Sequence, residues 1–344
     1  MYKVSVVIPI YNVEKYIERC AESLFKQTLD DMQFIFVDDA SPDESVRLLE
    51  QTLERFPLRK PHTIILHHAR NMGLPTARAT GMKYVEAPYV AHCDSDDYVE
   101  PTMYEKLYAN ATQNDSDMVM CGWKMHNIDG NEHSKFNKPL PKDSYVYNFL
   151  YGRIKPYVWP RLTKTDIYRK VIFPLEDYFE DGVQTAQLLT YASRISFIDD
   201  CLYHYARNPF SISNDRRSDI IEKKMRQCVT NYYWMHDFIV RHHPQIKEKM
   251  FALKKESIRF RFFPLIKRQQ YLQTFPELNF TILFYQEFSW QHKVSHFLIL
   301  LGLYPIVRAT YRVIKKYWFD IRSKVVTVST SVASTGMPVS RRHA

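Results

Sequence analysis

The chain has 344 residues, of which 45% are hydrophobic and 25% charged, as is ordinary for a globular protein that buries a sizeable core. Only 8 residues are glycine, which argues against a glycine-rich phosphate loop as the main device. The formal net charge of +9 is compatible with nucleic acid, an anionic membrane surface or a phosphorylated ligand. Many acids lie in the first hundred residues and the region after Arg207 is basic, so the excess charge lies away from the acidic motifs.

Strand and helix patterns alternate through the first 125 residues. Short apolar runs predict strands at 4–10, 34–37, 63–66, 89–93 and 118–121, and helical spacing predicts helices at 14–27, 42–56 and 75–85. This alternation predicts an α/β fold with a mostly parallel, Rossmann-like sheet flanked by helices. Ligands of such sheets bind beyond the carboxyl ends of the strands.

The rest of the chain is less regular. Residues 129–142 are polar, with Gly and Pro, which is typical of an exposed connection. Residues 145–213 are aromatic and mixed, residues 219–324 are predicted to be largely helical and basic, and residues 325–344 are predicted to be disordered.

Cysteine usage and the N-terminus indicate a cytosolic protein. The five cysteines are scattered, without the spacing of a zinc site, so we expect reduced and mostly buried thiols. The chain runs directly into a strand pattern, and no signal peptide is expected. The longest apolar stretch, residues 294–307, is too short to span a membrane and contains His296 and Pro305.

Three carboxylates follow the fourth predicted strand, at Asp94, Asp96 and Asp97. Carboxylates so close together repel one another, and Mg²⁺ or Mn²⁺ favours such oxygen ligands together with phosphate oxygens. The alternative is a solvated acidic turn before Pro101. The position at a strand end favours a metal and nucleotide site.

Two further acidic pairs are candidates. Asp38 and Asp39 end the second predicted strand. One of them could serve solely as a cap of the following helix, while the other accepts a hydrogen bond from a nucleotide base or ribose. Glu180 and Asp181 precede a helix, where they either interact with its dipole or supply a general base.

An aromatic, strand-like run ends in His204 and Arg207. A single histidine there is more often structural than a ligand, although a metal is the alternative. An arginine such as Arg207 pairs well with a diphosphate.

These motifs resemble those of family 2 glycosyltransferases of the GT-A fold, especially bacterial enzymes of capsule, exopolysaccharide or lipopolysaccharide synthesis. The resemblance covers roughly residues 3–215 and is carried by segments 4–12, 27–28, 37–41, 71–78, 94–101, 179–181 and 202–213. The asparagine that this family usually has after the Ala77-Arg78 pair is missing.

The resemblance implies an inverting transfer of a sugar from a nucleotide-sugar, usually a UDP-sugar, to a hydroxyl of a glycan or lipid-linked acceptor in cell-surface polysaccharide synthesis. Asp181 would be the catalytic base. The implied donor-binding residues are Pro9, Tyr11 and Asp39 at the base, and Arg78, Asp94, Ser95 and Arg207 at the ribose or diphosphate. Asp96, with Asp94 and His204 as further candidates, would hold Mn²⁺ or Mg²⁺.

The implied organisation is a GT-A catalytic domain at residues 1–215, with a nucleotide-binding half at 1–125 and an acceptor half at 145–215. A helical basic region would follow at 216–324. In it, an apolar patch at 297–304 lies beside basic residues, which predicts peripheral attachment to the inner face of the cell membrane. The alternative is a helix packed on the catalytic domain.

The sequence lacks the motifs that alternative functions would require. A sugar-1-phosphate nucleotidyltransferase needs a glycine-rich N-terminal loop, and a dehydrogenase needs GxGxxG after the first strand. The basic residues follow no nucleic-acid-binding motif. A non-catalytic, membrane-attached binding protein of the same fold is disfavoured by the presence of Asp96 and Asp181.

Overall fold

The computed structural model describes residues 1–126, 132–136, 145–208, 217–263, 265–286 and 288–310. The chain divides into two compact units, Met1–Lys255 and Glu256–Ala344. The domain boundary expected after residue 215 rests on the family resemblance and stays a prediction. The tail predicted to be disordered, residues 325–344, lies outside the described residues.

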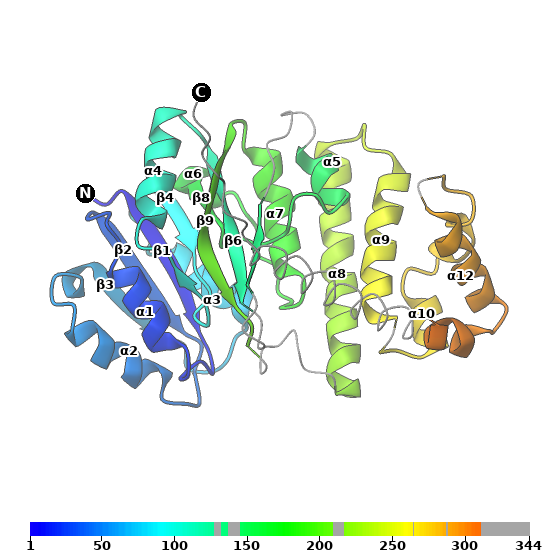
Figure 1. The fold of residues 1–344 in the computed structure, drawn as a ribbon, viewed down its shortest axis with the longest axis horizontal. Coiled ribbons are helices and arrows are strands. Elements are labelled where there is room, and N and C mark those ends of the chain that lie inside the picture. Colours follow the sequence, from blue (N-terminus) through cyan, green and yellow to red (C-terminus); the bar gives the residue numbers. More distant parts are fainter. Residues whose placement is uncertain (127–131, 137–144, 209–216, 264, 287, 311–344) are drawn as a thin grey trace, which may run out of the picture. The chain divides into compact units, whose positions relative to one another are not determined.

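The first unit is built on a sheet whose described strands follow the order β3-β2-β1-β4-β8-β6-β9-β5, with β7 paired to β6 (Figure 1). One half consists of β1 (Val4–Ile10), β2 (Met32–Asp38), β3 (Thr63–His67) and β4 (Tyr89–His92). These four strands are parallel, and all four were predicted from the sequence. The chain moves outward from β1 to β3 and then returns to place β4 on the other side of β1. A reversal of this kind is where α/β sheets bind ligands.

The other half of the sheet is mixed. It consists of β5 (Tyr98–Val99), β6 (Met118–His126), β7 (Glu132–Lys135), β8 (Arg161–Lys164) and β9 (Ile195–Ala206). Strand β8 is antiparallel to both β4 and β6, whereas β6 and β9 run parallel. Strand β5, directly after the acidic cluster, pairs antiparallel with β9. The acidic cluster is therefore tied to the later half of the sheet.

Helices cover both faces of the parallel half. The helices of the first unit are α1 (Ile17–Phe25), α2 (Ser45–Glu54), α3 (Leu74–Met82), α4 (Met103–Gln113), α5 (Tyr145–Leu150), α6 (Thr165–Tyr168), α7 (Glu180–Tyr191) and α8 (Ser218–His242). Val6 and Ile8 of β1 share a buried cluster with Leu24 of α1. Val7, which points to the opposite face, meets Gly81 of α3. This double burial explains why β1 is apolar throughout.

The second unit has its own small core. Helix α9 (Glu248–Phe262) crosses the division, and α10 (Arg268–Gln273), α11 (Leu278–Thr281) and α12 (Trp290–Leu300) follow. The buried Arg259 guanidinium lies over the Tyr271 ring and donates to His296. Within the described residues, none of the helices has the length and apolar character needed to cross a membrane.

The cysteines are free thiols, as expected. Four of them are buried and Cys201 is half-buried.

Replacing Gly81 by alanine tests the close packing of α3 on β1. In an open helix this change would stabilise the protein by up to about 1 kcal/mol. Here the added Cβ would lie 2.4 Å from Val7 Cγ1, so we expect the free energy of unfolding to fall by about 1–3 kcal/mol. Urea denaturation measures the change. In a Val7→Ala background the penalty should shrink, and strictly additive effects would contradict the contact.

Candidate active site

The loops after β1 and β2 are held together at the carboxyl end of the sheet. Asn12 and Ala40, just beyond these strands, have φ of 57° and 56°, in the left-handed region that residues other than glycine rarely adopt. The Asn12 amide donates to Ser41 Oγ at 2.8 Å, which links the two loops. Strained backbone that the surroundings enforce is common at functional sites.

Asp38 and Asp39 have different tasks. Asp38 Oδ1 accepts a hydrogen bond from the Ser41 amide at 2.8 Å, in the turn before α2. Helix α2 begins at Ser45 after Glu44, so neither aspartate has the capping role expected for one of the two. The two Asp39 oxygens accept one bond each from the amides of Met72 and Gly73, both at 2.8 Å, and Oδ1 also lies 2.7 Å from His68 Nδ1. Asp39 thus fixes the loop before α3, and a contact with a nucleotide base would use its remaining lone pairs.

The other two residues predicted at the base lie at the same edge of the sheet. Pro9 is buried in β1, in register with Val37 of β2, while Tyr11 follows the strand and is exposed. Of these two, Tyr11 offers a ring that a planar ligand can reach.

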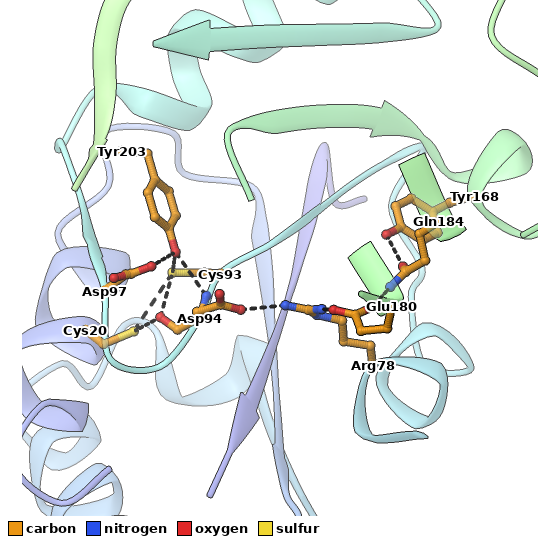
Figure 2. Close-up of polar contacts among 9 residues, drawn as sticks. All are labelled: Cys20, Arg78, Cys93, Asp94, Asp97, Tyr168, Glu180, Gln184 and Tyr203. Carbon is orange, nitrogen blue, oxygen red and sulfur yellow. Dashed lines mark hydrogen bonds and ion pairs between the residues drawn. The ribbon is translucent and has the colours of Figure 1, made fainter. Parts of the chain in front are cut away.

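Asp97 holds the acidic loop in place. Its Oδ2 accepts a hydrogen bond from the Tyr203 hydroxyl at 2.7 Å, and its Oδ1 accepts one from the Ala206 amide at 2.8 Å. The Tyr203 hydroxyl in turn accepts from the Asp94 amide at 3.1 Å. Burial, together with the charges of Asp96 and Asp94, raises the pKa of Asp97 well above its ordinary value. This carboxyl is fully buried and acts as a link to β9 (Figure 2).

Asp96 has a neutral partner. Its Oδ2 accepts a hydrogen bond from Asn208 Nδ2 at 3.1 Å, and Arg19 donates to its main-chain carbonyl at 2.9 Å. Burial and the charge of Asp94 raise the pKa of Asp96 to about 6. Ser95, which lies between Asp94 and Asp96 in the sequence, is buried. No sequence pattern indicates Asn208, because only the tertiary fold brings it to Asp96.

The donor chemistry of Asp94 and Asp96 fits a hard divalent cation. The described part of the chain holds no group of three or more His, Cys, Asp or Glu side chains arranged around a metal position. Mg²⁺ commonly binds through one or two carboxylates and completes its shell with waters and substrate phosphates. The two half-buried carboxylates supply the protein's share of such a shell.

Arg78 is buried between two carboxylates (Figure 2). It is 2% exposed, donates to Asp94 Oδ1 at 2.6 Å and also forms an ion pair with Glu180. Glu180 accepts a further hydrogen bond from Gln184. Burial raises the pKa of Glu180 to about 7, against the opposing effect of Arg78. Arg78 was predicted to lie near the ribose or diphosphate, and the structure shows it joining the acidic loop to the start of α7.

Asp181 is the more accessible of the acidic pair that begins α7. Phe179, directly before the helix, has a left-handed φ of 71°. A side chain at position 182 would collide with the Phe179 ring, so glycine is required there. Asp181 is half-buried, and its Oδ1 accepts from the Gly182 amide at 2.8 Å. Arg78 and Gln184 engage Glu180, which is buried, so Asp181 is the more accessible carboxylate of the pair.

His204 belongs to a different network from Asp96. Its Nε2 lies 2.8 Å from Glu100 Oε1, its Nδ1 lies 2.8 Å from His126 Nε2, and its ring stacks on Tyr98. Both ring nitrogens are therefore already engaged, and the geometry does not favour the metal role expected for His204.

Arg207 is exposed, and its amide donates to the His126 carbonyl at 3.2 Å. Its predicted contact with a diphosphate stays a prediction.

Comparisons with known proteins agree with this geometry. Residues 5–171 match the family model described as Glycosyl transferase family 2. The chain is 31% identical over 220 residues to the uncharacterized glycosyltransferase EpsJ of Bacillus subtilis. The chain contains a glycosyltransferase family 2 domain. The EpsJ match covers 61% of this chain and 62% of EpsJ.

A second relative and a solved structure are also similar to this chain. The glycosyltransferase GlyG of Streptococcus pneumoniae is 29% identical over 248 residues, which cover 66% of this chain and 80% of GlyG. The crystal structure of residues 1–349 of Staphylococcus aureus TarS, in complex with UDP-GlcNAc, superposes with a TM-score of 0.65 at 21% identity. It covers 90% of this chain and 91% of that one. The chain therefore has the predicted GT-A fold.

Arg78→Met tests the buried bridge between Asp94 and Glu180. The change leaves the buried Glu180 without its cation, so we expect a loss of about 3–5 kcal/mol in the free energy of unfolding. Adding Glu180→Gln should recover much of that loss, because an amide carries no charge. The matched control is Arg55→Met, whose ion pairs with Glu18 and Glu22 are more exposed and contribute at most about 1 kcal/mol. Equal effects of Arg78→Met and Arg55→Met in urea denaturation would contradict the role of the bridge.

Proposed function

We propose that the protein transfers a sugar from a UDP-sugar to an acceptor hydroxyl with inversion at the anomeric carbon. The observation that carries this proposal is the Arg78 bridge, because it joins a half-buried carboxylate loop at the donor edge of the sheet to the helix that presents Asp181. The likeness in fold to TarS, which was solved with UDP and with UDP-GlcNAc, supports a uridine nucleotide.

The donor would lie over the carboxyl ends of β1, β2 and β4. In this proposal Tyr11, Pro9 and Asp39 contact the base, while Ser95 and the Asp94–Arg78 pair line the ribose and diphosphate. Asp96 and Asp94 hold Mn²⁺ or Mg²⁺, which when bound offsets the negative charge of the diphosphate. Arg207 would add a second positive charge there.

Asp181 would act as the general base. It accepts the proton of the acceptor hydroxyl as that oxygen forms a bond to the anomeric carbon. The bond from this carbon to the diphosphate oxygen breaks in the same step, and the nucleoside diphosphate leaves with the electron pair. Because attack comes from the face opposite the leaving group, the configuration inverts. The transition state resembles the oxocarbenium ion of glycoside chemistry.

The acceptor we propose is a glycan or lipid-linked saccharide of a bacterial cell-surface polysaccharide, modified at the inner face of the membrane. Relatives support this class: the poly(ribitol-phosphate) beta-N-acetylglucosaminyltransferase TarS of Staphylococcus aureus is 30% identical over 217 residues, although these are only 36% of its length. The basic charge of the C-terminal part of the chain supports a membrane location.

Asp96→Ala tests the need for a metal. We expect Mn²⁺-dependent stabilisation by UDP-sugars to disappear in thermal-shift measurements while the melting temperature without ligand stays near that of the wild type, because only the donor-side charge is removed. The control is Asp30→Ala, an exposed carboxylate in a different loop. Full transferase activity in EDTA would rule out a required cation.

Asp181→Asn tests the base. The amide keeps the shape of the side chain and loses its basicity, so turnover should fall by roughly 10²–10⁴-fold with little change in donor affinity. A UDP-release assay with acceptor measures turnover, and the exposed Asp199→Asn serves as the control. If Asp181→Asn turned over normally, the base would have to be another group.

A further inference from the structure

Helix α12 presents a row of large apolar side chains to solvent. Trp290, Val294, Phe297 and Leu301 recur at steps of four, three and four residues, which places them on one side of the helix. Their exposed fractions are 69%, 47%, 50% and 61%. Single exposed apolar residues are common, but an aligned row of this kind marks an interaction surface. We call these four residues the outer stripe.

The opposite side of α12 fixes the outer stripe in this orientation. His296 and Ile299 are buried there. His296 Nε2 lies 2.9 Å from the Asn279 carbonyl, and its Nδ1 lies 3.2 Å from Arg259. A roll of the helix that buried the outer stripe would expose His296 and leave the buried Arg259 without this partner. Such losses are costly, so the outward direction of the stripe is built into the core of the second unit.

The end of α12 is also fixed. Arg268 donates to the carbonyls of Ile299 and Leu300, at 2.8 Å and 2.7 Å, and so satisfies acceptors that the end of a helix leaves open. Beyond the helix, Leu303 and Ile306 are exposed as well, at 40% and 59%. The apolar surface therefore continues past the last turn of α12.

The charge of this part of the chain indicates what covers the surface. From Ser289 to the C-terminus the sequence has nine lysines and arginines and a single acid, Asp320. Lys293 lies on α12 between Trp290 and Val294 in sequence, beside the outer stripe. Trp, Phe and Leu on one helix face, with basic residues around them, are typical of helices that lie in the headgroup region of anionic bilayers.

We infer that the outer stripe of α12 is a docking surface for an anionic lipid bilayer, in which Trp290, Phe297 and Leu301 enter the acyl boundary and Lys293 contacts the headgroups. This inference deepens the proposed location at the membrane and is independent of the sugar-transfer chemistry. The sequence predicted membrane attachment through the apolar patch at residues 297–304. The present inference instead assigns the membrane contact to one face of α12, whose other face is buried.

Co-sedimentation of the full chain with vesicles tests the inference. The wild type should bind vesicles of equal parts phosphatidylglycerol and phosphatidylcholine, and bind pure phosphatidylcholine much more weakly. Phe297→Ser/Leu301→Ser should weaken binding roughly a hundredfold, since each of the two large apolar side chains contributes roughly a factor of ten. The matched control, Leu58→Ser/Val240→Ser, removes exposed apolar side chains of the first unit and should bind as the wild type does.

Three companion measurements separate the alternatives. The rate of donor hydrolysis, measured as UDP release without vesicles, should be the same in the stripe variant as in the wild type. If neither the wild type nor any variant hydrolysed the donor, the result would count against the proposed reaction and not against docking. Unchanged vesicle binding by the stripe variant would overturn the inference. So would a melting temperature lowered by more than a few degrees, which would mean that the stripe packs within the chain. A change from dimer to monomer in light scattering would assign the stripe to a second copy, and would equally overturn it.

Discussion

The buried guanidinium of Arg78 is the interaction on which the rest of the site depends. Removing a charge from water is costly, and a buried arginine is tolerated only where carboxylates and hydrogen bonds surround it. Asp94 and Glu180 meet this need from two different segments, the loop after β4 and the first turn of α7. The planar fork of arginine can contact both at once, which the single ammonium of lysine does less well. The acidic loop after β4 and the start of α7 are therefore joined by one buried side chain.

The acidic loop shows how three neighbouring carboxylates are compensated in different ways. Asp94 has the cation of Arg78, and Asp97 has the Tyr203 hydroxyl and the Ala206 amide. Asp96 accepts a hydrogen bond from the neutral amide of Asn208, and its pKa is raised to about 6. A group whose charged form is poorly stabilised gains most from a nearby cation. A divalent ion beside Asp96 would therefore stabilise the charged form of this carboxyl.

The sequence predicted the parallel half of the sheet because β1, β2 and β4 are short apolar runs, and acidic residues follow β2 and β4. It did not predict β8, since this strand contains the buried Arg161 and Thr163 and lacks an apolar pattern. It placed Asp181 and the acidic loop at the site, but it could not separate their roles. The tasks of Asp97 and Glu180 depend on Tyr203 and Arg78, which lie about one hundred residues away along the chain. The engagement of His204 by Glu100 and His126 is likewise a tertiary contact.

The left-handed residues beside the site add a further constraint. Asn12, Ala40 and Phe179 each follow or precede an element that carries a site residue, and a non-glycine residue in this region costs of order 1–3 kcal/mol. The cost is offset locally, by the Asn12–Ser41 bond and by the contact between Phe179 and Gly182. Backbone that is strained and held in this way has few alternative conformations. The loops that would surround a donor are thus ordered in advance, and binding energy can go to the reacting groups instead of to ordering the loops.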